Sequence, residues 1–165
     1  PCGWHGDRDH GCRCSISQRQ RYWQRLSGPL LDRLDLQLRL ERSSAREMAA
    51  VLKQPRQTQA SASWCKPALI ERARQRMQRR NPGGASNGRL SAAALQQSGA
   101  IEATALELWE QLINQRGLST RSRLQLLRVA RTIADLNDRT SVDRNALAEA
   151  SCFRCTDLIK QPGAQ

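Results

Sequence analysis

Two stretches with the apolar spacing of helices, separated by a glycine, constrain the fold of this chain more than any other feature. Residues 102–116 and 119–136 both place apolar side chains three and four positions apart, as in a helix with one buried face. These positions are Ala105, Leu108, Trp109, Leu112, Leu126, Val129, Ala130, Ile133 and Leu136. Gly117 suits the left-handed position that follows a helix. We therefore expect two neighbouring antiparallel helices on a short connection.

Shorter segments before this pair have the same helical character. Pro67 is placed to begin a helix over residues 68–80, because proline is favoured in the first turn. The Asn-Pro-Gly-Gly sequence at 81–84 ends that helix, and a short helix is expected over 91–97.

A last helix is expected from residue 143 to about 155, where Thr140 and Asp143 resemble a capping box. Four or five antiparallel helices on short loops predict a bundle over 65–156. The tail 157–165 is expected to be disordered. The fold class predicted for the chain is mainly α.

The first forty residues follow a different pattern. A helix is expected over 18–26, and Gly28-Pro29 breaks it. Alternating leucines over 35–40 predict a half-buried strand, which would be the edge of a larger sheet. Arg33 lies at the corner between the two and is thereby aimed away from its own helix.

A change of composition separates these two parts. Residues 43–64 are rich in serine, glutamine, alanine and arginine, and we interpret them as a linker with a short helix over 45–53. The expected units are therefore 1–42, the linker, and the helical bundle at 65–156.

Three cysteines lie in one short glycine-containing loop. Cys2, Cys12 and Cys14 could converge as thiolates on one tetrahedral zinc ion. The Cys-x-Cys spacing is tighter than the usual zinc pattern, and three reduced thiols in an irregular loop are the alternative. His5, His10 or a water molecule could complete the ligand set.

The chain is strongly basic, with 27 Lys and Arg against 15 Asp and Glu and a net charge of +12. Such an excess predicts a polyanionic partner, most commonly nucleic acid, although arginine-rich solvated helices give the same count. No apolar run is long enough to cross a bilayer, so we expect no membrane partner. Six cysteines in an arginine-rich helical chain suit a reducing cytoplasm better than a disulfide scaffold.

Three segments, in this order, resemble one protein family. They are the cysteine loop, the sequence SGPLLDRLDL at 27–36, and LLRVARTIADL at 126–136. Together they are similar to the ComM/YifB branch of the AAA+ ATPases related to magnesium chelatase. The resemblance implies the end of an AAA+ α/β core, with a zinc-like loop, a helix and an edge strand, followed by a C-terminal helical lid. It also implies a fourth cysteine two positions before Cys2.

The resemblance assigns roles to the arginines. Arg33 matches the arginine finger, which reaches a nucleotide bound by the adjacent subunit. Arg128 matches the sensor 2 arginine of the lid, with Arg131 as the second choice. Without the resemblance, we would expect Arg33 to be a surface arginine paired with Asp32 or Asp35. We would expect Arg131 to form a pair with Asp135 on a solvated helix face.

The implied assembly is a homo-oligomeric, hexameric ring that uses ATP and Mg²⁺. The chain holds no G-x-x-x-x-G-K-[ST] phosphate loop, so we expect it to be the C-terminal piece of a larger ATPase and inactive alone. The leading prediction is a motor that remodels DNA by helicase-like or branch-migration activity. The alternatives are a chelatase-type ATPase driving metal insertion into a tetrapyrrole, and a stand-alone basic zinc module that binds nucleic acid.

Overall fold

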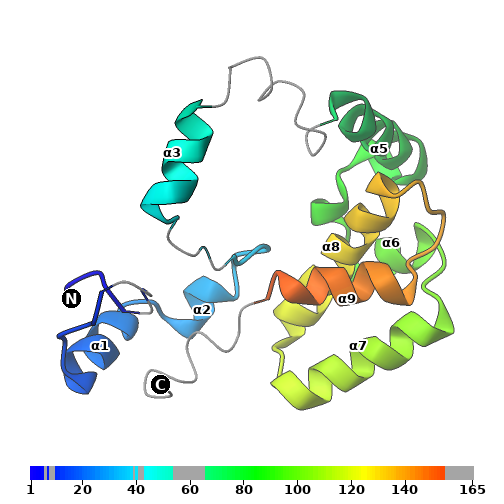
Figure 1. Cartoon of the computed structure of the whole chain (residues 1–165). Helices are drawn as coiled ribbons and strands as arrows, with labels where there is room; N and C mark the ends of the chain where they lie inside the picture. The colour runs from blue at the N-terminus through cyan, green and yellow to red at the C-terminus, as the bar shows by residue number, and fades with distance from the viewer. Residues whose placement is uncertain (6, 8–9, 39, 41–42, 54–65, 155–165) are drawn as a thin grey trace.

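A computed structural model describes residues 1–5, 7, 10–38, 40, 43–53 and 66–154 (Figure 1). Its helices are α1 Ile16–Trp23, α2 Gly28–Leu31, α3 Ala45–Lys53, α5 Pro67–Arg80, α6 Ala92–Gln97, α7 Ala103–Arg116, α8 Thr120–Leu136 and α9 Arg144–Cys152, with 3-10 turns η1 Pro82–Gly84 and η2 Asn87–Arg89. The mainly α fold is confirmed. Linker residues 54–64 and the expected tail at 157–165 lie outside the described residues.

The helical bundle is built around α8. Helices α5 and α9 and the turn η2 contact α8, and α7 packs against α9. Figure 1 shows α5 to α9 gathered into one body. Its core consists of buried aliphatic side chains, among them Leu95, Ala105, Leu112, Leu126, Ala130, Ile133, Val142 and Leu147. Each buried leucine or isoleucine contributes about 1.5–3 kcal/mol of hydrophobic free energy, so this body holds most of the stability.

The residues at the helix ends of the bundle explain why the helix boundaries could be predicted from the sequence. Gly117 has φ 59° and ends α7 in the left-handed conformation, and the Ser119 side chain accepts a hydrogen bond from the amide of Ser122 at the start of α8. The capping box expected at Thr140 is wrong. Asp143 itself caps α9 by accepting a 2.7 Å hydrogen bond from the amide of Ala146.

The strand expected over 35–40 does not form within the described residues. Residues 35–38 have no regular structure, and the bridge between Ile101 and Val142 is an isolated one. A strand is stabilised by pairing with a neighbouring strand, and no other strand is present among the described residues. The amide of Gln37 instead donates a 2.8 Å hydrogen bond to the carbonyl of Phe153 at the end of α9.

The N-terminal helices are short and carry little core. The helix expected over 18–26 begins at Ile16 and ends at Trp23, with a capping box formed by Ser15 and Gln18. None of α1, α2 and α3 contains a buried residue. Most of the leucines that follow α1 are exposed, namely Leu26, Leu30, Leu34, Leu36, Leu38 and Leu40, whereas Leu31 is half-buried. No helix in the described part of the chain is both long enough and apolar enough to span a bilayer.

Candidate functional site

Arg33 leaves the chain at a tight corner. The Ser27 side chain accepts a hydrogen bond from the amide of Leu30 and so begins α2, with proline in its first turn. The amide of Arg33 donates to the carbonyl of Leu30 at 3.0 Å, which closes the turn just after the helix. The Arg33 side chain is exposed, and within the described residues it has no hydrogen bond or ion pair.

The expected alternative partner of Arg33 is engaged elsewhere. Asp32 accepts a 2.8 Å hydrogen bond from the hydroxyl of Ser122 on α8. Hydrogen bonding from Ser119 does most to lower the pKa of the Asp32 carboxyl. Burial opposes this effect and the hydrogen bond from Ser122 adds to it, so the pKa lies below its ordinary value. The Arg33–Asp32 pair is therefore not formed, and Asp32 joins the corner to the bundle.

A buried arginine makes a second connection between the corner and the bundle. Arg154, just after α9, is 5% exposed. Its Nη1 donates to the carbonyl of Leu34 at 3.1 Å, and its Nη2 donates to the side-chain oxygen of Gln125 on α8. This contact could not be predicted from the sequence, because the two residues that it joins are 120 positions apart.

Arg131 lies inside the bundle rather than on its surface. Its side chain is 1% exposed and donates to Oδ1 of Asp135 at 2.9 Å, to the carbonyl of Thr140 at 2.7 Å and to that of Arg139 at 2.7 Å. The expectation that Arg131 and Asp135 form a pair on a solvated helix face is wrong. Helix α5 and turn η2 contact α8 and bury this pair.

A polar network surrounds Asp135, which is 0% exposed. Arg80 of α5 donates to both carboxylate oxygens of Asp135. The side-chain nitrogen Nδ2 of Asn87 donates to Oδ2 of Asp135 at 2.7 Å. Burial raises the pKa of Asp135, but the hydrogen bonds from Arg80 and Asn87 outweigh it, and the pKa lies below its ordinary value. Asp135 is thus held ionised as a link between α5, η2 and α8.

Arg128 is the more accessible of the two arginines that are predicted as candidates for a sensor role. It is half-buried on α8, and its Nε donates to the carbonyl of Leu90 at 2.8 Å. Its Nη2 donates to the same carbonyl oxygen. No described carboxylate is paired with it. Leu90 precedes α6, so the guanidinium of Arg128 lies at the junction of α8 with the η2–α6 connection.

The cysteine loop brings its thiols together. The Sγ atoms of Cys2, Cys12 and Cys14 all lie within 4.8 Å of one another, and those of Cys2 and Cys12 are 3.6 Å apart. Thiolates held at about 2.3 Å from one tetrahedral zinc ion are ~3.8 Å apart, so this arrangement fits the metal. Hydrogen bonds from the backbone of Trp4 and then Arg13 lower the pKa of Cys2 to about 6.

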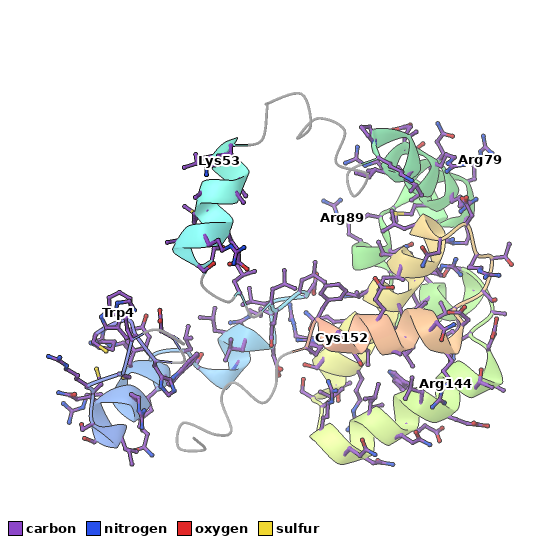
Figure 2. The ribbon with its side chains drawn as sticks, in the orientation of Figure 1. Trp4, Lys53, Arg79, Arg89, Arg144 and Cys152 are labelled. Carbon is purple, nitrogen blue, oxygen red and sulfur yellow. The ribbon has the colours of Figure 1, made fainter. Side chains whose placement is uncertain are left out.

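Neither histidine of the loop lies with the three sulfur atoms in the cluster. His10 stacks on Trp4, with ring centroids 4.2 Å apart, and its Nδ1 lies 3.3 Å from Asp7. His5 Nδ1 lies 3.3 Å from a guanidinium nitrogen of Arg19 on α1. Figure 2 shows Trp4 on the loop beside α1.

The sequence of the bundle and of the end of the linker matches a family description. Residues 58–154 match the family described as magnesium chelatase, subunit ChlI C-terminal. The chain belongs to the magnesium chelatase ChlI family. Residues 1–48 match the description magnesium chelatase, subunit ChlI. The matches divide the chain at a point close to the expected linker.

Similarity to curated proteins narrows the branch of this family. The chain is 34% identical to the YifB protein of Salmonella typhimurium over 147 residues, covering 89% of the chain. It is 31% identical to YifB of Escherichia coli over 147 residues, covering 89% of the chain, and 30% identical to the competence protein ComM of Haemophilus influenzae over 152 residues, covering 90% of it. The chain is thus of the ComM/YifB type within an AAA+ family. It spans 28% of the length of each of these three relatives.

Proposed function

We propose that this chain provides two cations to the nucleotide sites of a ring-forming AAA+ ATPase. Arg33 would act across the boundary between subunits, and Arg128 would contact the nucleotide of its own subunit. The observation that carries the proposal is the exposed guanidinium of Arg33, which has no partner among the described residues and lies at a corner whose neighbouring carboxylate, Asp32, is bonded to Ser122.

The chemistry of a trans arginine explains why such a side chain must be free. In phosphoryl transfer, negative charge spreads over the γ-phosphoryl oxygens, and a planar guanidinium can bind two of them at once. Fingers of this type supply about 10³–10⁵ in rate. ATP and Mg²⁺ would be held mainly by the rest of the protein, because the chain contains no phosphate-loop motif.

The buried position of Arg131 supports Arg128 as the sensor arginine of the lid. Arg131 is bonded to Asp135 and to two backbone carbonyls inside the bundle. Within the part of the chain that the structure describes, the guanidinium of Arg128 is bonded to the carbonyl of Leu90 alone, and a phosphate oxygen is the stronger acceptor for a guanidinium. Exchange of that carbonyl for a phosphate would connect nucleotide binding to the position of α8.

The cysteine loop would hold a structural zinc ion through Cys2, Cys12 and Cys14. Three sulfur atoms within 4.8 Å and a thiol whose pKa is about 6 are the supporting observations. The ion would fix a loop in which the amide of Cys2 already donates a 3.1 Å hydrogen bond to Sγ of Cys14.

Nucleic acid is the partner we propose for the whole assembly, with DNA remodelling as its activity in the cytoplasm. The net charge of +12 and the similarity to a competence protein support this choice. The name of the matching family favours one second candidate, an ATPase that drives magnesium insertion. DNA binding by the whole protein with a steep salt dependence would support the first candidate, and salt-insensitive or absent binding would favour the second.

The decisive experiment on Arg33 compares Arg33→Ala with Arg25→Ala, which removes an exposed arginine just after α1. In the whole protein, Arg33→Ala should leave ATP binding nearly intact and lower kcat by about 10³ or more, whereas Arg25→Ala should change neither. Unchanged turnover in Arg33→Ala would remove the finger assignment. Mixing Arg33→Ala subunits with subunits that cannot bind ATP tests whether the residue acts in trans.

A further inference from the structure

The residues on either side of Arg33 are both bonded to the helical bundle, whereas the side chain of Arg33 is not. Asp32, the preceding residue, accepts from Ser122 on α8, and the carbonyl of Leu34, the following residue, accepts from Arg154 after α9. Three residues farther along, the amide of Gln37 donates to the carbonyl of Phe153. The corner is thereby held at three points against the adjoining ends of α8 and α9.

Arg154 is the central member of this contact. One nitrogen of its guanidinium bonds to the corner at Leu34, and another bonds to Gln125 in the bundle. Arg154 and Gln125 are 5% and 2% exposed, so the connection is shielded from water. Hydrogen bonds from a buried cation are directional and stronger than those between neutral groups, so this contact fixes the orientation of the backbone it holds.

The fixed orientation bears directly on Arg33. A finger must present its guanidinium within a fraction of an ångström of the transferring phosphoryl group, and a mobile backbone would lose that position. The side chain of Arg33 has no described partner to orient it, so its direction depends on the backbone between Asp32 and Leu34.

We propose that Arg154 is a positioning residue for Arg33, which clamps the finger corner to the lid of the same subunit. This inference rests on the proposed function of Arg33 for its catalytic part. A movement of α8 and α9 then carries the finger with it, so that the state of one nucleotide site is transmitted to the neighbouring site through Arg154.

The clamp can be measured without nucleotide, by amide hydrogen exchange on the 165-residue chain. In Arg154→Gln the amide of Gln37 should exchange at least about tenfold faster, while amides in the middle of α8 keep their protection. The matched control is Arg144→Gln, which removes an arginine from the other end of α9, as Figure 2 shows by the positions of Arg144 and Cys152. The control should leave Gln37 unchanged.

Asp32→Ala provides the same measurement from the side of the corner. Asp32 lies outside the bundle, so the variant leaves the bundle helices intact even if Arg154→Gln does not fold. It should also accelerate exchange at Gln37 relative to α8. Unchanged exchange at Gln37 in either folded variant overturns the proposal, and so does an equal acceleration at Gln37 and in α8.

Activity of the whole protein separates this inference from the assignment of Arg33. Arg154→Gln should lower kcat at least about tenfold while the KM for ATP stays constant, because substrate binding does not involve the corner. If Arg33→Ala retains turnover, the finger assignment fails while the exchange result still decides the clamp. If Arg33→Ala is inactive and Arg154→Gln is fully active, the positioning role is excluded.

Discussion

Arg80 and Asp135, 55 positions apart in the sequence, meet inside the bundle with two hydrogen bonds of 2.5 and 2.8 Å between guanidinium and carboxylate. Arg131 approaches the same carboxylate from its own helix at 2.9 Å. Two cations therefore share one buried anion, and Asn87 completes the set. The arrangement joins α5 to α8 by charge as well as by apolar packing.

Asp135→Ala should destabilise the bundle by about 3–5 kcal/mol, because it leaves the buried guanidinium of Arg131 without a counter-charge. Urea unfolding of the chain, followed by circular dichroism, measures the change. Asp138→Asn is the control, since Asp138 is 44% exposed in its pairs with Arg72 and Arg76, and a surface pair contributes about 1 kcal/mol or less. A similar loss of unfolding free energy in both variants would contradict the claim that the buried ion pairs stabilise the bundle more than the exposed ones.

Arg128→Ala and Arg131→Ala should have opposite effects. Arg128→Ala should weaken ATP binding by the whole protein about tenfold or more, through loss of a charged hydrogen bond to phosphate, with little change in unfolding. Arg131→Ala should mainly lower stability, because it leaves Asp135 with one cation fewer. Titration with a fluorescent ATP analogue and thermal unfolding measure the two properties. Unaltered ATP affinity in Arg128→Ala would exclude it as the sensor.

Acid should release the finger corner from the bundle. The pKa of Asp32 is lowered in the folded chain, so its ionised form stabilises docking above the pKa of the unfolded state, and this stabilisation is lost as the pH falls through the lower folded value. The amide resonance of Gln37 should therefore shift as the pH is lowered below about 4. In Asp32→Asn that titration should disappear, and its persistence would point to another carboxyl group.

The cysteine loop should bind one zinc ion per chain, and Cys12→Ser should abolish stoichiometric binding. Cys152→Ser is the control, because Cys152 is exposed at the end of α9 and takes no part in the cluster. Metal must displace protons from the thiols. The backbone hydrogen bond from Cys2 lowers the pKa of Cys14, but hydrogen bonding with the Cys2 thiol and burial raise it above its ordinary value, so affinity should already fall as the pH is lowered through the neutral range. The fall should steepen below about pH 6, where Cys2 also becomes protonated. Zinc measured after dialysis tests both statements. A chain that folds normally without bound metal would remove the zinc proposal.

The bundle could be predicted from the sequence because its signals are local. Apolar spacing and the terminal residues Gly117 and Asp143 act within one or two helical turns, and the structure uses both. Whether residues 35–40 form a strand could not be predicted from local signals. Alternating leucines form a strand only when a neighbouring strand pairs with them, and the described residues contain no such strand.

The site was only partly predictable for a related reason. Helical geometry places Arg131 and Asp135 next to each other on α8, but it carries no information about what covers that face. Arg80 and Asn87 cover it from distant positions, which changes an exposed pair into a buried network. Arg154 could not be identified either, because its partner Leu34 lies at the other end of the described chain.

The contact between Leu34 and Arg154 also determines the order in which the chain can assemble. Closing a loop of 120 positions has a large entropic cost, whereas the turns between α7, α8 and α9 close loops of a few residues. We therefore expect the helical bundle to fold first, from local contacts, and the corner bearing Arg33 to attach afterwards to a surface that is already complete. The geometry proposed for Arg33 would then be acquired in the last step of folding.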